Sequence, residues 1–176
     1  MNDLMLLSFL LAGPQHGYAM KKQAGAFSGQ PDMHNNLVYP LLKRFVANGW
    51  VSKRSAAGKR GQTRGVYALT AKGRKELLRR LGKFTSKEAA SENEFRLRVG
   101  LFMALDKDTC KRILNERDTW LAAREERFAK MEENIDLGEW GGEVVRFLRE
   151  AARAERIWIA SLKRKVERNC TKSRGV

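Results

Sequence analysis

Residues 34–45 read HNNLVYPLLKRF, a helical pattern that contains a proline. Apolar side chains recur along it at the spacing of one helix face: Leu37, Leu41, Leu42 and Phe45. A proline in a helix interior removes a backbone donor and clashes with the preceding turn, at a cost of roughly 3 kcal/mol. Pro40 therefore limits where this helix can begin.

The helix tolerates Pro40 if it begins at Asn35 or Asn36. With either asparagine as the N-cap, Pro40 is the fifth or fourth helical residue, near the end at which backbone donors lack helical partners. We therefore predict that His34 lies in the preceding turn and that at least one asparagine acts as the cap.

Two short helices are expected before this one. Residues 3–12 are apolar on most sides and stop at a Gly-Pro pair, and residues 16–27 offer a second helix. The third helix should end near Asn48 and Gly49, because a glycine in this place favours a left-handed C-cap.

A β-hairpin is expected after the third helix. Residues 51–53 and 66–69 are the only convincing strand candidates, and they flank a loop rich in glycine and positive charge. The cations in and around this loop are Arg54, Lys59, Arg60 and Arg64. Thr70 can then cap a helix over residues 71–81.

The positive charge of the chain is concentrated in its first half. The formal net charge is +15 over 176 residues. Residues 1–85 hold 15 Lys and Arg against 3 Asp and Glu, a net +12, whereas residues 86–176 hold 20 against 17, a net +3. A positive field on one half indicates a polyanionic partner, of which nucleic acid is the commonest.

Three helices, a hairpin with a basic tip and a fourth helix follow the order of a winged helix-turn-helix. In that fold one helix enters the major groove of DNA and the wing contacts phosphates or the minor groove. The predicted fold class is therefore mostly α with a small β-hairpin wing, followed by an all-helical dimerisation domain. The candidate DNA-binding residues are His34, Asn35, Asn36, Tyr39 and Lys43 on the third helix, Lys59, Arg60 and Arg64 on the wing, and Tyr18 and Lys22 on the second helix.

Three motifs carry a resemblance to a known family. LLAGPQHGYAMKK, NNLVYPLLKRFVANGWV and GQTRGVYALTAKGRKEL resemble, in order and spacing, the elements of PadR-type transcriptional regulators. The resemblance covers residues 4–81, and the later helices are similar to the helical C-terminal domain of the longer, virulence-activator-like subfamily. It implies a homodimeric bacterial repressor or activator whose C-terminal helices are exchanged around the two-fold axis.

The chain departs from the family pattern at the start of the third helix. Such regulators usually carry Ser and Gly where this chain has His34 and Asn36, and Leu where it has Val38. A glycine permits a closer backbone approach to DNA than an asparagine does. We therefore expect the operator, or the tightness of docking, to differ from those of relatives.

The second half is expected to be helical and to dimerise. The predicted domains are residues 1–84 for DNA binding, 85–93 as a linker or helix start, and 94–176 for dimerisation. The last helix carries one continuous apolar stripe: Val144, Leu148, Ala151, Ala154, Trp158, Leu162 and Val166. All of these except Ala154 are the candidate dimer contacts. Packing within a single-chain bundle is the equally balanced alternative.

An effector site is a further hypothesis. The resemblance implies a small aromatic effector, and Trp120 and Trp158 are the candidate pocket residues. Tryptophans at helical spacing are more often core residues than ligand cages, so the two interpretations stay open. No metal site and no cofactor are expected.

Other classes of protein fit the sequence less well. Only two histidines, His16 and His34, are present, with no phosphate-binding glycine loop and no paired Cys or His at ligand spacing, so we expect no enzyme. A winged-helix adaptor that binds RNA or a protein partner is the alternative. The operator, the regulated genes and the choice between repression and activation cannot be derived from the sequence.

The cysteines and the N-terminal sequence indicate the cellular compartment in which the protein is expected. Cys110 and Cys170 are far apart and have no CxxC partner, which favours reduced thiols and a cytoplasmic protein. The apolar run at residues 4–12 lacks a preceding Lys or Arg, so it is not expected to act as a signal peptide.

Overall fold

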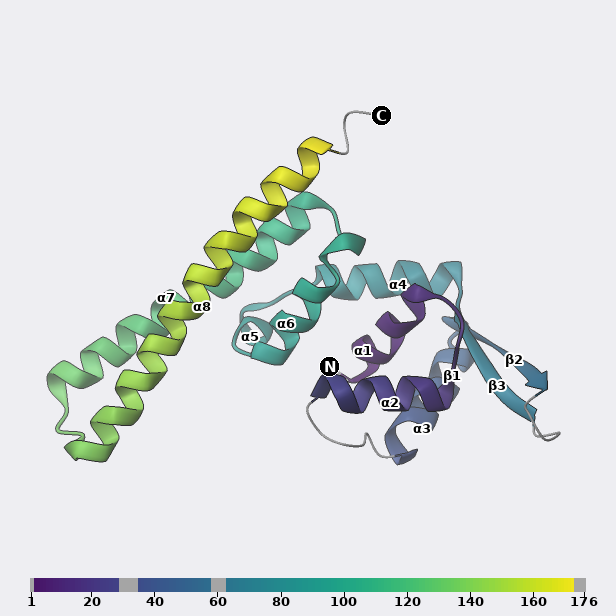
Figure 1. The fold of residues 1–176 in the computed structure, drawn as a ribbon, viewed down its shortest axis with the longest axis horizontal. Coiled ribbons are helices and arrows are strands. Elements are labelled where there is room, and N and C mark those ends of the chain that lie inside the picture. The colour runs from purple at the N-terminus through teal and green to yellow at the C-terminus, as the bar shows by residue number, and fades with distance from the viewer. Residues whose placement is uncertain (1, 29–34, 58–62, 173–176) are drawn as a thin grey trace. The chain divides into compact units, whose positions relative to one another are not determined.

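The computed structural model describes residues 2–28, 35–57 and 63–172 (Figure 1). The chain divides into two compact units, Met1–Lys83 and Phe84–Val176. None of the helices in the described ranges is long and apolar enough to cross a membrane. The predicted fold class is confirmed, since helices dominate and a small antiparallel sheet lies in the first unit.

The N-terminal unit has the element order of a winged helix. Its elements are α1 (Asn2–Phe9), the 3-10 helix η1 (Leu10–Ala12), β1 (Gln15–His16), α2 (Gly17–Ser28), α3 (Asn35–Ala47), β2 (Val51–Ala57), β3 (Thr63–Leu69) and α4 (Ala71–Gly82). The apolar run that begins the chain is helical and buried on most sides, as predicted: Leu4, Met5, Leu6, Leu7 and Leu10 are all in the core.

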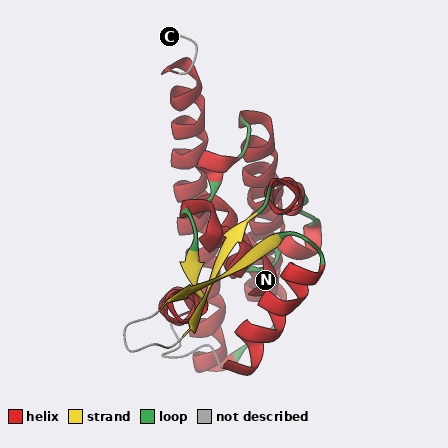
Figure 2. Cartoon of the chain, turned by 90° about the vertical axis from the view of Figure 1, so that its right-hand side faces the viewer, coloured by secondary structure: helices red, strands yellow, loops and turns green. Residues whose placement is uncertain are grey.

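The sheet has three strands in the order β1-β3-β2 (Figure 2). Both pairings are antiparallel, and Gln15 and His16 pair with Tyr67 and Val66 of β3. The prediction of two strands alone was wrong, because a two-residue strand is too short to show alternation in its sequence. The hairpin strands are also longer than predicted, since pairing in register continues from Val51 to Ala57.

Helix α3 contains Pro40 and ends as predicted. Its described part begins at Asn35, which makes Pro40 its sixth residue rather than its fourth or fifth. The residue before Asn35 lies outside the described ranges. Gly49 has a φ of 70°, and the Trp50 N–H donates to the Phe45 carbonyl oxygen at 2.9 Å. This left-handed C-cap is a Schellman arrangement, which usually requires glycine.

Thr70 joins the ends of three elements. Its side-chain oxygen accepts a hydrogen bond from the Gly73 N–H at 2.9 Å, which confirms the predicted cap of α4. Its hydroxyl donates to the Gly49 carbonyl oxygen at 2.7 Å, and its N–H donates to the Trp50 carbonyl oxygen at 3.0 Å. The end of α3, the base of the hairpin and the start of α4 are thus tied together.

The second unit is entirely helical in its described part. Its elements are α5 (Ser86–Ala89), α6 (Glu92–Gly100), the 3-10 helix η2 (Phe102–Ala104), α7 (Lys107–Asn134) and α8 (Gly138–Lys172). Helices α7 and α8 lie side by side and antiparallel (Figure 1). The core residues are Phe84, Ala89, Phe95, Ile113, Leu114, Leu121, Ala152 and Ile159.

Two arginines are fully buried in this helical core. The Arg117 side chain is 0 % exposed, donates to both carboxylate oxygens of Glu155 at 2.8 and 2.7 Å, and donates to the Ala89 carbonyl oxygen at 2.6 Å. Arg98 donates to Glu94 and Glu88 at 2.6 and 2.7 Å. The sequence suggested no such role, because an arginine on a heptad face is usually solvated.

Replacing Arg117 with alanine should destabilise the helical unit strongly. The change leaves Glu155, whose side chain is only 13 % exposed, without this partner, for which we expect a loss of about 3 kcal/mol in the free energy of unfolding. Urea denaturation followed by circular dichroism measures it. Arg153→Ala is the matched control, because Arg153 is 65 % exposed in its ion pair with Glu125 and should cost below about 1 kcal/mol. Equal losses for the two variants would contradict the structural role of Arg117.

Candidate nucleic-acid interface

Helix α3 has one buried face and one exposed face. Val38, Leu42 and Phe45 are completely buried in the N-terminal unit. The opposite face carries Tyr39, which is 45 % exposed, and the exposed Lys43, one helical turn further along. Both were predicted to bind DNA, and the structure leaves both side chains accessible.

The side chains of several predicted DNA-binding residues lie outside the described part of the chain. His34, Lys59 and Arg60 fall in the ranges that are not described, and Asn35, Asn36 and Arg64 are described only in their backbone, within α3 and β3. On α2, Tyr18 is 71 % exposed and Lys22 is exposed.

The two described carboxylates of the N-terminal unit form ion pairs with a separate set of arginines. Asp3 lies 2.8 Å from Arg80 and 3.6 Å from Arg44. Glu76 bonds to Arg79 and Arg80 at 2.8 and 2.6 Å. Hydrogen bonds from Arg79 and then from Arg80 lower the pKa of Glu76 to about 2, so the carboxylate stays charged.

Four cations on α2, α3 and β2 have no carboxylate partner among the described residues. They are Lys22, Lys43, Lys53 and Arg54, and all four are exposed. Unpaired cations create a local positive potential that attracts phosphates. Two of them lie on the wing strand β2, where the consecutive residues Lys53 and Arg54 face opposite sides of the strand.

Residues 6–79 match the profile described as the Transcriptional regulator PadR-like family. The chain belongs to this family. The matched residues span α1 to α4 nearly completely, which is the winged-helix unit described above. A comparison with curated protein sequences gave no match.

Solved structures of transcriptional regulators are similar to this chain. The Thermoplasma acidophilum protein TA0346, described as a transcriptional regulator, is 33 % identical, with 43 % of this chain and 72 % of that chain covered and a TM-score of 0.41. Bacillus subtilis PadR in complex with operator DNA is 18 % identical, with 93 % and 98 % covered and a TM-score of 0.46. The same protein in complex with p-coumaric acid is 19 % identical, with 94 % and 99 % covered and a TM-score of 0.40.

The predicted dimer stripe on α8 divides between two faces. Leu162 and Val166 pack against the core of their own unit, and Leu148 is half-buried. Three other members of the stripe are exposed: Val144 at 57 %, Ala151, and Trp158 at 39 %. Packing within one chain thus accounts for Leu162 and Val166 but not for the exposed members of the stripe.

Exposed apolar side chains that the sequence reasoning missed complete a second stripe on α8. Trp140 and Phe147 are 78 % and 67 % exposed. The exposed stripe consists of Trp140, Val144, Phe147, Ala151, Ala154 and Trp158. Its steps of four, three, four, three and four residues are those of a coiled-coil seam. The signal that could have found it is this regular alternation.

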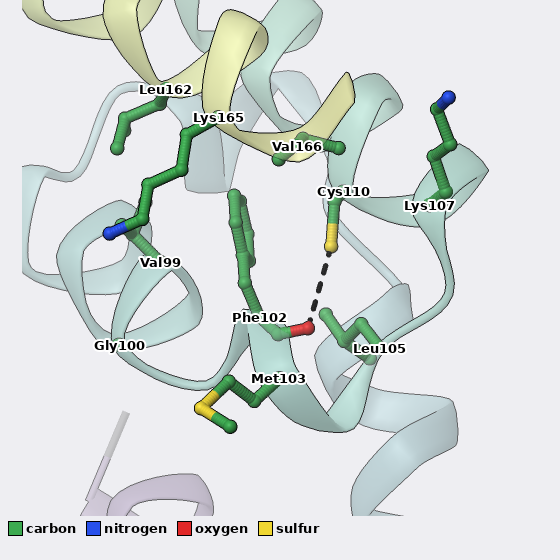
Figure 3. A pocket seen from close by; sticks show the side chains of 10 residues that line it. All are labelled: Val99, Gly100, Phe102, Met103, Leu105, Lys107, Cys110, Leu162, Lys165 and Val166. Carbon is green, nitrogen blue, oxygen red and sulfur yellow. Dashed lines mark hydrogen bonds between the residues drawn. The ribbon is translucent and has the colours of Figure 1, made fainter. Parts of the chain in front are cut away.

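Trp120 is partly buried against the helical core, whereas Trp158 is partly exposed at its edge. The Trp120 ring is contacted by the guanidinium groups of Arg117 and Arg124 at 4.9 and 5.2 Å. The Trp158 ring lies edge-on against Phe95, with the ring centroids 5.9 Å apart. A cavity of about 620 Å³ in this unit is lined by other residues: Val99, Gly100, Phe102, Met103, Leu105, Lys107, Cys110, Leu162, Lys165 and Val166 (Figure 3).

Proposed function

We propose that this transcriptional regulator is a homodimeric repressor that binds double-stranded DNA in a sequence-specific manner. The observation that carries the proposal is the winged-helix unit, whose exposed cations on α2, α3 and β2 lack carboxylate partners among the described residues. The PadR-like match over the same unit supports it.

The mechanism assigns different tasks to α3 and to the wing. The N-terminal half of α3 enters the major groove, where Asn35 and Asn36 contact base edges, since asparagine can bond adenine through two hydrogen bonds. Tyr39 and Lys43 lie on the exposed face of the same helix. The wing contacts phosphates, which fix the position of the protein without reading sequence.

Binding to DNA should depend steeply on salt and on sequence. We expect affinity for a duplex from upstream of the protein's own gene to fall by orders of magnitude between 50 and 200 mM salt, because bound phosphates release counterions. Fluorescence anisotropy with this duplex, a random duplex and an RNA of the same sequence measures it. Affinity that is independent of salt, or equal for all three nucleic acids, would refute the proposal and favour the adaptor alternative.

Substitutions in the wing and in α3 should have different effects. Replacing Lys59, Arg60 and Arg64 with alanine should weaken binding to every duplex and reduce the salt slope by about 1 per lost phosphate contact. Asn35→Ala should change the preferred base at one position. Binding-site selection from a randomised duplex pool compares the variants. The reverse pattern would move sequence recognition away from α3.

The dimer proposal rests on the exposed stripe of α8. An apolar seam of this length facing solvent favours pairing with a second helix, and a second copy of the chain supplies an identical one. The proposed interface includes Val144, Ala151 and Trp158 from the sequence prediction and adds Phe147 and Trp140.

Phe147→Glu should convert the dimer into a monomer. A charge in the centre of the seam would be buried without a partner on association. Sedimentation velocity measures the change, with Ala160→Glu as the control, because Ala160 is an exposed α8 residue outside the seam. A chain truncated after residue 85 should be monomeric as well. A Phe147→Glu protein that remains a tight dimer would exclude this seam as the interface.

A ligand response is a further part of the proposal. The cavity beside η2 supports it, because its wall is mainly apolar and Lys165 extends over it from α8 (Figure 3). An apolar cavity with an amine at its edge suits an aromatic acid. Cys110 is not available as a nucleophile there, since burial raises the pKa of its thiol to about 11.

A further inference from the structure

The three tyrosines of the chain all line one cavity in the N-terminal unit. Tyr18 comes from α2, Tyr39 from α3 and Tyr67 from β3. The cavity has a volume of about 650 Å³, and its other lining residues are His16, Gly17, Ala19, Lys53 and Gly65. Five successive elements of the winged helix, from β1 to β3, therefore line a single cavity.

Two glycines keep this cavity open. A Cβ atom on Gly17 would lie 3.0 Å from Cε1 of Tyr39. A Cβ atom on Gly65 would lie 3.0 Å from Cε of Lys53 and 3.4 Å from Oη of Tyr67. Side chains at either position would enter the space between the tyrosines and the lysine. The absence of a side chain, rather than an unusual backbone conformation, is what these positions provide.

The Tyr67 side chain is nearly buried, but its hydroxyl is open to the cavity and lacks a partner among the described residues. The residue is 7 % exposed, and its hydroxyl makes no hydrogen bond to any described residue. Burial, and then the charge that Tyr39 would carry, raise the pKa of Tyr67, so the hydroxyl is protonated and can donate. The hydroxyl is therefore a donor available to any acceptor that enters the cavity.

The groups around the cavity select an anion. Lys53 is exposed and has no carboxylate partner among the described residues. The first residues of α2, Gly17 and Tyr18, bring backbone N–H groups that have no helical acceptor. No Asp or Glu is among the lining residues that the structure describes. A lysine, hydroxyl donors and a helix N-terminus together match the oxygens of a phosphate.

We infer that this tyrosine cavity holds one phosphate of the DNA backbone, beside the groove that α3 enters. The inference rests on the proposed function, adds Tyr67 and the two glycines to the binding surface, and gives Lys53 a defined phosphate to contact. The Tyr67 hydroxyl and the Lys53 amine contact the phosphate oxygens, and the start of α2 faces the same group. This contact fixes the distance between α3 and the duplex and is independent of base sequence.

Three substitutions test the cavity on the full chain. Tyr67→Phe removes only the hydroxyl, Gly65→Ala places a methyl group against Lys53 and Tyr67, and Lys53→Gln removes the charge at an exposed site. Each should weaken binding to specific and random duplexes alike, by roughly 10- to 100-fold for a lost bond to a charged group. Gly142→Ala is the control, because its Cβ atom would meet nothing within 4 Å and it lies in the helical unit. Unchanged affinity of all three variants, in a protein that binds DNA, refutes the cavity and leaves the proposed function standing.

A modified duplex identifies the phosphate. Neutral methylphosphonates replace the backbone phosphates one at a time, and each duplex is titrated with wild-type protein and with Tyr67→Phe. One position should weaken wild-type binding without weakening Tyr67→Phe further, since the variant has already lost that contact. Losses that add at every position overturn the inference. A Tyr67→Phe protein that binds all duplexes as wild type does, but loses affinity for inorganic phosphate by NMR titration, assigns the cavity to a free phosphate and overturns it too. A wild type that binds no duplex refutes the proposed function itself.

Discussion

The N-terminal unit depends on the hydrogen bonds made by Thr70. One residue accepts from the start of α4 and donates to two carbonyl oxygens at the end of α3. Because β2 begins and β3 ends at this point, the bonds fix the base of the hairpin relative to both helices. Gly73 allows this closeness, since a Cβ atom there would lie 1.9 Å from the Trp50 carbonyl oxygen. These contacts therefore set the direction of the wing relative to α3.

Much of the winged helix could be predicted because its boundaries are set by local chemistry. Thr70 and Gly49 act through their own neighbours, so a short stretch of sequence reveals them. The strand β1 and the buried Arg117 could not be found in this way. Each is defined by a partner far along the chain, Tyr67 for Gln15 of β1 and Glu155 for Arg117, and no local pattern records such pairs.

The candidate site was predictable to a similar degree. Exposed residues such as Tyr39 and Lys43 follow from helix periodicity, because the buried face of α3 determines the outer one. Tyr67 lay within the strand predicted over residues 66–69, and its unpaired hydroxyl is visible only once α2, α3 and β3 are assembled. On α8, one apolar stripe was recognised but Trp140 and Phe147 were missed, because the division into an inner and an outer face depends on how α7 packs against it.

The two units differ in how many of their positive side chains are paired with carboxylates, and this difference affects how the protein searches for its operator. In the helical unit many arginines and lysines are bound to carboxylates, whereas Lys22, Lys43, Lys53 and Arg54 of the first unit have none among the described residues. On the proposed function, such a surface holds the protein loosely on any duplex, where it can slide and hop. Most copies in a cell would then be on non-specific DNA, and the search for an operator would proceed along the chromosome rather than through free solution.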